Sequence, residues 1–493
     1  MTAHLKRRIG PVVVSLVYVV LGLAYCFRWG PVAQHVPSLW LIPKDLPHTY
    51  YAAAALAHGH FSEIYQPAVA FLSYPGILIV LAPLGALSGV FSGSIVEIGV
   101  DHHLLAHPRV FPISNASSLL LAKSPGFSDG REYVLHATVF EALIPVALLL
   151  ACTSLFAFDA LAERLQVSRE RRIVLSVLEA VLLWNVTVPW GHPEDAVAVA
   201  LATYALVFAI DRRFTGAGWL FGAAVATQPL VLLVAPVLLV MAGRRHGVGL
   251  AIRSVLPSAV LLAVPLVASF RTTVHALVLQ PSYPNIDHAT PWTALAPHIS
   301  GHGAALTVAS GPGRIVAFVV AIGLGIWVVG RRWLVHPERL ALACAVALAL
   351  RSYTESVMAA YYPWTALAVG LVVAARCTRL RFAIAGALAI GTTIVANFKI
   401  AWLPWWAIEM AGMTALLVAA ARPQPIEPAS QRVRPARVRA ATTTRGRSPS
   451  ASSKRDAPGQ SRSSASAPGR SGSEPAKKKG RSTSTGSTRS GRR

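Results

Sequence analysis

One carboxylate, Asp45, stands directly after the first long apolar segment and just before an Ala-rich stretch that Gly59 ends. Asp is a favoured N-cap, Ala has a high helix propensity and Gly commonly follows a helix end, so the sequence predicts a short helix headed by Asp45. Two interpretations of Asp45 remain open. It is either a helix cap or a general base that accepts a proton from a substrate hydroxyl.

The second cluster of ionisable residues is His192-Pro193-Glu194-Asp195, at the start of another apolar segment. Polar and charged side chains at the edge of a membrane span often bind substrates, because they are costly to keep there. Alternatively, Glu194 and Asp195 fill the first turn of the next helix, where the helix dipole favours negative charge. The sequence leaves both interpretations open.

Gln228 and Arg351 are candidates for contact with a phosphate or a sugar. Gln228 precedes Pro229 within an apolar segment, and its neutral amide can donate a hydrogen bond but brings no charge. Arg351 follows an apolar segment, and a guanidinium can bind a phosphate through two parallel hydrogen bonds. Glu355 lies four residues further on, so an ion pair between Arg351 and Glu355 on one helix is the alternative.

Residues 270–314 form a long segment between apolar stretches, and its Pro, Asn and Asp residues predict a stiff, turn-rich loop. Tyr283 and Trp292 could stack on a sugar ring, and His288 could stabilise a departing phosphate. This interpretation makes the loop a lid over a cavity. The alternative is that its aromatic residues belong to a belt at the membrane interface.

The composition requires a membrane protein. The chain is 54% hydrophobic and only 13% charged, and its mean hydropathy is +0.53, which excludes a soluble globular class. Residues 9–29 follow Lys6-Arg7-Arg8, are long enough to span a bilayer and lack a signal-peptide cleavage site, so they predict a retained first span. Further apolar segments recur at about 137–158, 173–189, 195–210, 217–242, 254–269, 315–330, 338–350, 356–375, 382–398 and 402–421.

Clusters of basic residues separate these segments unevenly, and the positive-inside rule places them in the cytoplasm. The opposite loops, which include 30–72 and 270–314, are then extracytoplasmic. This alternation requires that 217–242 cross twice, hinged at Gln228-Pro229, and that 73–92 add no net crossing. Broken helices at membrane depth need protein or water around their backbone, so we expect an internal cavity. Residues 93–136 form an insert without an identifying composition.

The last part of the chain, 422–493, contains eighteen Lys and Arg residues, only three acidic ones and almost no apolar residues. It cannot bury enough apolar surface to fold, so we expect a disordered cytoplasmic tail after an integral membrane domain at 1–421. Its charge predicts contact with anionic lipid headgroups. No folded nucleic-acid reader accompanies it, so specific nucleic-acid binding is not expected. The four cysteines suggest neither a disulfide framework nor a zinc site.

Several of these features resemble the first extracytoplasmic loop of polytopic GT-C glycosyltransferases, and most closely glycosyltransferase family 87, the polyprenyl-phosphate-mannose-dependent mannosyltransferases of actinobacteria. The resemblance rests on Asp45, Tyr50-Tyr51-Ala52, Gly59, Tyr65, Tyr74-Pro75 and Ala82-Pro83-Leu84. It implies that Asp45 is the catalytic base, and His48 and Tyr51 on the same predicted helix are candidates for substrate contact. Two positions depart from the family pattern, because His-Pro-Glu-Asp at 192–195 replaces a Gly-Gln/Asn pattern and Gln228 replaces the usual Lys.

The resemblance therefore predicts an all-α polytopic bundle of about 10–13 membrane segments in the cell membrane. The expected reaction is inverting transfer of a sugar, with mannose implied, from a polyprenyl-phosphate donor to a lipid or glycan acceptor on the extracytoplasmic side. No cofactor other than the lipid-linked donor is expected, no metal is implied, and no nucleotide-cradling Gly-rich motif is present. The alternatives are a transporter or flippase for a lipid-linked glycan, whose halves often match, and a scaffold without catalytic activity.

Overall fold

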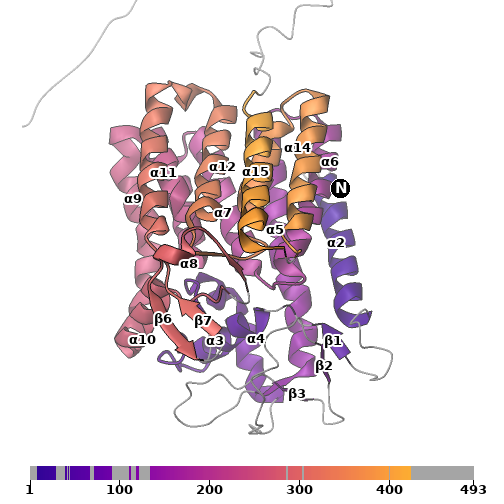
Figure 1. Cartoon of the computed structure of the whole chain (residues 1–493), viewed down its shortest axis with the longest axis vertical. Helices are drawn as coiled ribbons and strands as arrows, with labels where there is room; N and C mark the ends of the chain where they lie inside the picture. The colour runs from indigo at the N-terminus through magenta and orange to yellow at the C-terminus, as the bar shows by residue number, and fades with distance from the viewer. Residues whose placement is uncertain are drawn as a thin grey trace, which may run out of the picture. The chain divides into compact units, whose positions relative to one another are not determined.

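The computed structural model describes residues 8–28, 39–41, 43, 45–66, 71–91, 110–112, 118–120, 134–284, 287–302, 305–398 and 400–422 (Figure 1). The chain divides into a unit of residues 1–426 and a unit of residues 427–493, and the second lies outside the described residues. The predicted tail beyond residue 422 and most of the predicted insert at 93–136 also lie outside them.

The described part of the first unit is built from helices, as expected. They are α2 (Ile9–Arg28), α3 (Leu46–Ala57), α4 (Gly76–Phe91), α5 (Ala137–Arg164), α6 (Arg169–Thr187), α7 (Pro193–Ile210), α8 (Phe214–Thr227), α9 (Ala235–Ala268), α10 (Phe270–Val274), α11 (Gly313–Gly330), α12 (Pro337–Thr354), α13 (Trp364–Ala374), α14 (Arg379–Val395) and α15 (Trp402–Ala420). Short helical turns, η2 (Pro229–Val234), η3 (His275–Leu279), η4 (Thr293–Leu295) and η5 (Trp333–Val335), connect some of them.

Six helical segments among the described residues are long and apolar enough to cross a membrane, which confirms the membrane class. They are Ile9–Cys26, Ala142–Arg164, Pro193–Ile210, Pro229–Ala268, Gly313–Gly330 and Trp402–Ala420. Their outer faces expose large apolar side chains, such as Val319 of α11 and Val255 of α9, as helices facing lipid tails do. Every residue of α13 is buried. Many of the buried residues are Ala, and small side chains let membrane helices approach closely.

The segment 217–242 folds as the sequence predicts. α8 runs to Gln228, η2 reverses the chain, and the first part of α9 returns until Gly243, whose φ of 59° breaks the helix. Phe214 at the start of α8 stacks on His246 after this break, with ring centroids 5.3 Å apart. Both ends of the hairpin therefore lie at the same end of the bundle, with the hinge at Gln228-Pro229.

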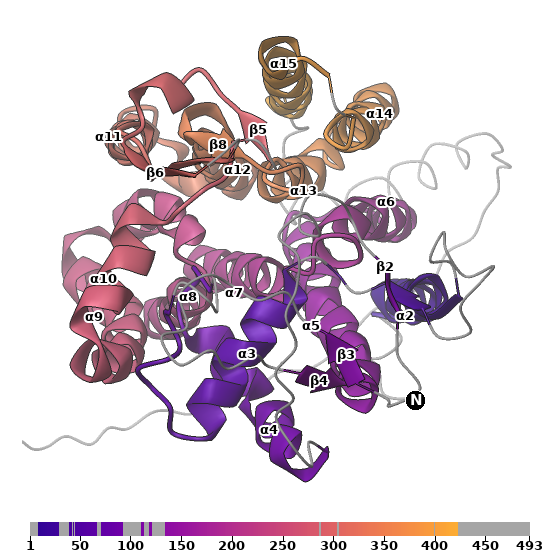
Figure 2. The same ribbon diagram turned by 60° about the horizontal axis from the view of Figure 1, so that its bottom comes forward.

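The segment 73–92 also behaves as expected. It forms α4, which contains Pro83 and packs against α3 and the hairpin helix α8. Figures 1 and 2 show α3 and α4 together at the end of the bundle that also carries the short strands. This segment therefore adds no passage to the opposite end.

Short antiparallel strand pairs are an addition that the all-α expectation did not include. β1 (Leu39–Leu41) pairs with β2 (Val110–Pro112), β3 (Ser118–Leu120) with β4 (Val134–His136), β5 (His288–Ala289) with β8 (Val357–Met358), and β6 (His298–His302) with β7 (Ala305–Val308). The predicted turn-rich loop at 270–314 thus contains α10, η3 and a hairpin. Extended backbone outside a helix pairs in this way to satisfy its own polar groups.

A buried ion-pair network fixes the first helix at the opposite end of the bundle. Arg8 bonds Asp159 and lies 2.5 Å from Glu163 Oε2, while the Nε of Arg172 donates to Asp159 Oδ1 at 2.7 Å. Only 1% of the Asp159 side chain is exposed. Because a buried carboxylate is stable only when it is paired, this network ties α2 to α5 and α6.

Gly191 determines how the α3 region meets the turn between α6 and α7. Its φ is +76°, and a Cβ there would lie 2.7 Å from Pro43 Cβ and 2.8 Å from the backbone nitrogen of Leu46. Only a residue without a side chain allows both the left-handed backbone and this close approach. Gly191 is therefore needed to bring Asp45, which directly precedes Leu46, against the start of α7.

We expect Gly191→Ala to lower the midpoint of thermal unfolding more than Gly59→Ala does. Gly59 has the same kind of backbone, with a φ of +75°, but nothing lies within 4 Å of a Cβ placed there. Both variants carry the strain of a left-handed alanine, roughly 1–2 kcal/mol, so the excess measures the crowding at Gly191. Equal shifts for the two purified variants in detergent would contradict this packing.

Candidate active site

Asp45 occupies the N-cap position of α3, but its side chain makes no capping hydrogen bond. Its backbone N–H donates to Trp190 O at 2.9 Å, and its Oδ2 lies 2.9 Å from His192 Nε2. Asp45 thus stands at the predicted N-cap position, but its carboxylate turns to the start of α7 and forms no capping hydrogen bond. It keeps 29% of its side-chain surface exposed, which a base that meets a substrate requires.

His192 lies between two carboxylates. Its Nδ1 is 2.6 Å from Glu194 Oε1, and 13% of the His192 side chain and 3% of the Glu194 side chain are exposed. Burial by itself lowers the pKa of His192, but the charges of Glu194 and Asp45 and their hydrogen bonds outweigh it and hold the pKa well above its ordinary value. An imidazolium between two carboxylates is thus the favoured state at neutral pH.

Asp195 connects this triad to the hinge of the α8–α9 hairpin. Gln228 Nε2 donates to Asp195 Oδ1 at 2.6 Å and lies 3.0 Å from Ser73 Oγ. Glu194 and Asp195 do occupy the first turn of α7, so the structural interpretation holds. Glu194 also contacts His192, and Asp195 also contacts Gln228. The position in the first helical turn and a role in a binding site are therefore compatible for these two residues.

Two tyrosines in the turn before α13 connect His192 to Arg351. The His192 ring stacks on Tyr361 with centroids 4.2 Å apart, and Tyr361 meets the edge of Tyr362. The guanidinium carbon of Arg351 lies 3.6 Å from the centre of the Tyr362 ring, a cation–π contact. Asn185 Nδ2 holds this turn by donating to Ala360 O at 3.0 Å.

Arg351 shares the carboxylate of Glu355 with a second cation, Arg314. Arg314 donates to both oxygens of Glu355, from Nη2 to Oε1 at 2.7 Å and from Nε to Oε2 at 3.0 Å, whereas the Nε of Arg351 is 3.8 Å from Oε1. The Nη1 of Arg351 is buried and has no hydrogen-bond partner among the described residues. Glu355 thus lies between two guanidinium groups, Asp195 also acts electrostatically on Arg351, and one buried donor of Arg351 has no partner among the described residues.

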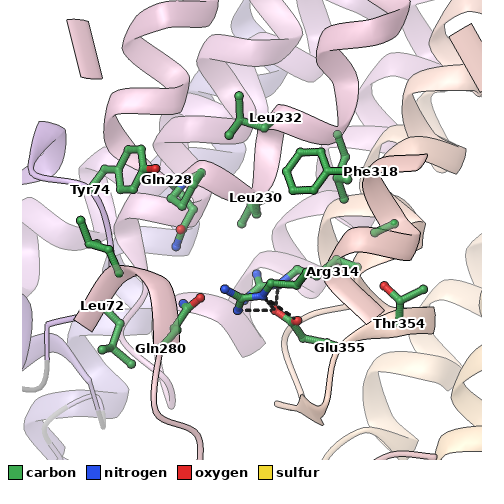
Figure 3. Close-up of a pocket in the computed structure, with 15 residues that line it drawn as sticks. Leu72, Tyr74, Gln228, Leu230, Leu232, Gln280, Arg314, Phe318, Thr354 and Glu355 are labelled. Carbon is green, nitrogen blue, oxygen red and sulfur yellow. Dashed lines mark hydrogen bonds and ion pairs between the residues drawn. The ribbon is translucent and has the colours of Figure 1, made fainter. Parts of the chain in front are cut away.

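A cavity of about 200 Å³ opens beside these groups (Figure 3). Its polar wall consists of Tyr74, Gln228, Gln280, Arg314, Arg351, Thr354 and Glu355. Its apolar wall comes from η2, η3 and α11 through Leu230, Leu232, Leu233, Leu277, Ala317 and Phe318. The cavity therefore combines a cationic end with a hydrocarbon-lined side, which suits an amphiphilic anion.

The structure brings six of the predicted residues into one connected region, namely Asp45, His192, Glu194, Asp195, Gln228 and Arg351. Arg314 was not predicted, although the Gly-Pro-Gly-Arg sequence before an apolar segment marked a cation at a helix start. Gly313 allows its position, because a Cβ there would lie 1.7 Å from Thr354 O. Ser73 was also missed, since no pattern in the sequence distinguishes it.

The remaining predicted residues lie around this region. His48 and Tyr51 are partly buried on α3, and Tyr51 packs beside Tyr50 with ring centroids 6.3 Å apart. His288 stacks on the buried Trp405 at 3.7 Å, and Trp292 Nε1 donates to Tyr353 O at 2.7 Å. His288 and Trp292 do not line the cavity described above, so their contact with substrate stays a prediction.

The loop that contains His288 and Trp292 is fixed to the segment that carries Glu355. Thr290 Oγ1 donates to Glu355 O at 2.6 Å, and β5 pairs with β8 in the register His288 to Met358. Gln280 of the same loop lines the cavity. The loop thus holds the backbone beneath the Arg314–Glu355 pair in place.

Within the part of the chain that the structure describes, no three His, Cys, Asp or Glu side chains are grouped to hold a metal ion. No protein-family model matches this sequence, and no curated protein matches it significantly.

The raised pKa of His192 predicts a pH-dependent stability. A His whose pKa is raised by folding contributes stability that is fully present below its unfolded pKa, about 6.5, and is lost as pH rises through the folded pKa. The difference in the free energy of unfolding between wild type and His192→Gln should therefore shrink above that pH, with a slope approaching about 1.4 kcal/mol per pH unit.

The exposed His60, whose Nδ1 is 3.7 Å from Glu63 Oε2, provides a control. His60→Gln should change stability by a small amount over the same pH series in detergent. A wild-type-minus-His192→Gln difference that does not vary with pH would show that His192 is not held as an imidazolium.

Proposed function

We propose that this chain is a membrane glycosyltransferase that transfers a sugar from a lipid-linked phosphate donor to a hydroxyl acceptor, with inversion at the anomeric carbon. The observation that carries the proposal is a carboxylate–imidazole–carboxylate triad that is connected, through the hydrogen bond between Asp195 and Gln228, to a cavity with two arginines in a helical membrane protein. Asp45 of the triad can accept a proton, and the two arginines can hold an anionic leaving group. The resemblance of the first loop to glycosyltransferase family 87 supports a polyprenyl-phosphate donor carrying mannose.

In the proposed reaction Asp45 accepts the proton of the acceptor hydroxyl while its oxygen bonds to the anomeric carbon. The bond from that carbon to the phosphate oxygen breaks, and the phosphate leaves with the electron pair from the opposite face, which inverts the configuration. His192 acts as a positioning residue, because Glu194 and Asp45 bind its two nitrogens and fix the ring between them.

Arg351 and Arg314 would stabilise the phosphate as it leaves. Charge-assisted hydrogen bonds to a phosphate are strong in a site shielded from water, and the Nη1 of Arg351 is a buried donor without a partner among the described residues. Gln228, which stands where the family has a lysine, uses its two N–H donors on Asp195 and Ser73, so it would position Asp195 and would not bind the phosphate itself. The apolar wall formed by Leu232, Leu277 and Phe318 would contact the first part of the hydrocarbon chain.

Transport of a lipid-linked glycan is the second candidate, and the interrupted α8–α9 hairpin favours it, because broken membrane helices are common in transporters. A transporter has no need of a base. The two functions differ in their product, since transfer yields a new covalent glycoside and transport does not. Incubation with polyprenyl-phosphate mannose and extracted lipid acceptors therefore distinguishes them.

Asp45→Asn should lower sugar transfer by roughly 10²–10⁴-fold, because an amide of the same shape cannot accept the proton. The fold should be retained, since Asn can still bond His192. The measurement is formation of glycosylated lipid by purified protein supplied with donor and acceptor. Asp211→Asn is the control, because Asp211 pairs with Arg164 outside the proposed site, and near-full activity of Asp45→Asn would place the base elsewhere.

Arg351→Gln should lower kcat/KM for the lipid-phosphate donor by about 10–100-fold, since a hydrogen bond to a charged group contributes about 1.5–3 kcal/mol. Glu355 keeps its bidentate partner Arg314 in this variant, so the loss reports on the phosphate. Arg351→Lys should restore part of the activity through its charge. Arg332→Gln in the turn before η5 is the control for general charge loss, and kinetics of Arg351→Gln equal to wild type would exclude this phosphate contact.

A further inference from the structure

A second cavity, of about 300 Å³, lies at the turn between α7 and α8, beside the part of α9 that follows its break. Arg212, Arg213 and His246 line it together with Phe208, Phe214 and Thr215. None of the described residues that line it is acidic. The neighbouring carboxylate, Asp211, is paired with Arg164, so the cavity keeps its positive charge.

Aromatic contacts hold two of these side chains in place. The guanidinium carbon of Arg213 lies 4.5 Å from the centre of the Phe208 ring, and the His246 ring stacks on Phe214 at 5.3 Å. Neither contact uses a carboxylate, so neither one neutralises the charge of Arg213. A guanidinium that is already positioned loses less entropy when it binds a phosphate.

Apolar side chains on the helices that form this cavity are exposed. Trp219 follows Thr215 by one turn on α8 and is 46% exposed, while Val248 and Ile252, which follow His246 on α9, are 71% and 59% exposed. In a membrane protein such surfaces face lipid tails. A phosphate bound by Arg212 and Arg213 would thus have hydrocarbon contacts next to it, as basic pockets that bind lipid headgroups do.

We propose that this cavity binds the headgroup phosphate of an anionic phospholipid, whose acyl chains lie along Trp219, Val248 and Ile252. The site is separate from the proposed active site, since it shares no residue with the triad or with the cavity of Arg351. The proposal concerns one lipid bound in a defined pocket of the folded domain. It is distinct from the unspecific attraction to anionic lipids that we expect of the basic C-terminal segment.

The test is a titration of the full-length protein in detergent with phosphatidylglycerol, followed by native mass spectrometry. The double variant Arg212→Gln/Arg213→Gln should bind the lipid at least about tenfold more weakly than wild type, because two charge-assisted contacts are lost. Phosphatidylcholine, whose headgroup has no net charge, should bind both proteins weakly and equally.

Arg331→Gln/Arg332→Gln is the matched control, because it removes the same charge from another turn with an arginine in the left-handed conformation. The φ values are 61° at Arg212 and 56° at Arg332. All variants keep the basic C-terminal segment, so its contribution cancels. Equal weakening by the two double variants, or none by Arg212→Gln/Arg213→Gln, would overturn the proposal.

Thr215→Glu tests the same site without removing an arginine. A Glu in the first turn of α8 is favourable for the helix, so this exposed position should tolerate it, yet its carboxylate would repel a phosphate in the cavity. We expect it to lose phosphatidylglycerol binding as the double variant does, and retained binding would contradict the proposal. Competition by inorganic phosphate at the same concentration as the lipid would assign the cavity to a soluble phosphate and overturn the lipid part.

Discussion

The placement of His192 between Glu194 and Asp45 is the interaction on which the described site depends. It joins the start of α3, which follows the first membrane helix, to the first turn of α7 inside the bundle. The same ring stacks on Tyr361 before α13, so three separate parts of the chain meet at one imidazole. Because the ring is mostly buried, its charge is stable only between the two carboxylates. Loss of either carboxylate would change the charge of the ring as well as its position.

The two arginines at the cavity also need opposite charge nearby, because they too are charged groups in a largely apolar bundle. Arg351 and Arg314 are charges at the end of a largely apolar bundle, Glu355 pairs with both, and Asp195 also acts electrostatically on Arg351. A ring face of Tyr362 covers the guanidinium of Arg351, which stabilises the charge without neutralising it. Charged side chains held within an apolar bundle are costly to folding and need such partners.

The backbone around these groups is fixed by reversals that an uninterrupted membrane helix would not allow. The hinge at Gln228 and Pro229 places an amide beside Asp195 and lines the cavity with the leucines of η2. The β5–β8 pair and the Thr290 hydrogen bond hold the segment that presents Glu355. Non-helical backbone inside an apolar bundle is stable when its polar groups find partners within the protein. Because α8 ends at this hinge and η2 follows it, the leucines of η2 line the cavity.

The sequence by itself determined the membrane class, most helix positions and the reversal at Gln228-Pro229. These features follow from local hydrophobicity, Pro and charge counts, which act over neighbouring residues. It also singled out Asp45, His192, Glu194 and Arg351, because ionisable groups beside apolar segments are rare. Only the tertiary structure decided that Asp45 bonds His192 instead of capping α3, and that Arg314 shares Glu355 with Arg351. The short strands and the Tyr361–Tyr362 connection were likewise not predictable. Each of these depends on residues that are distant in the chain and meet only when the helices pack, and no local pattern records which pairs will meet.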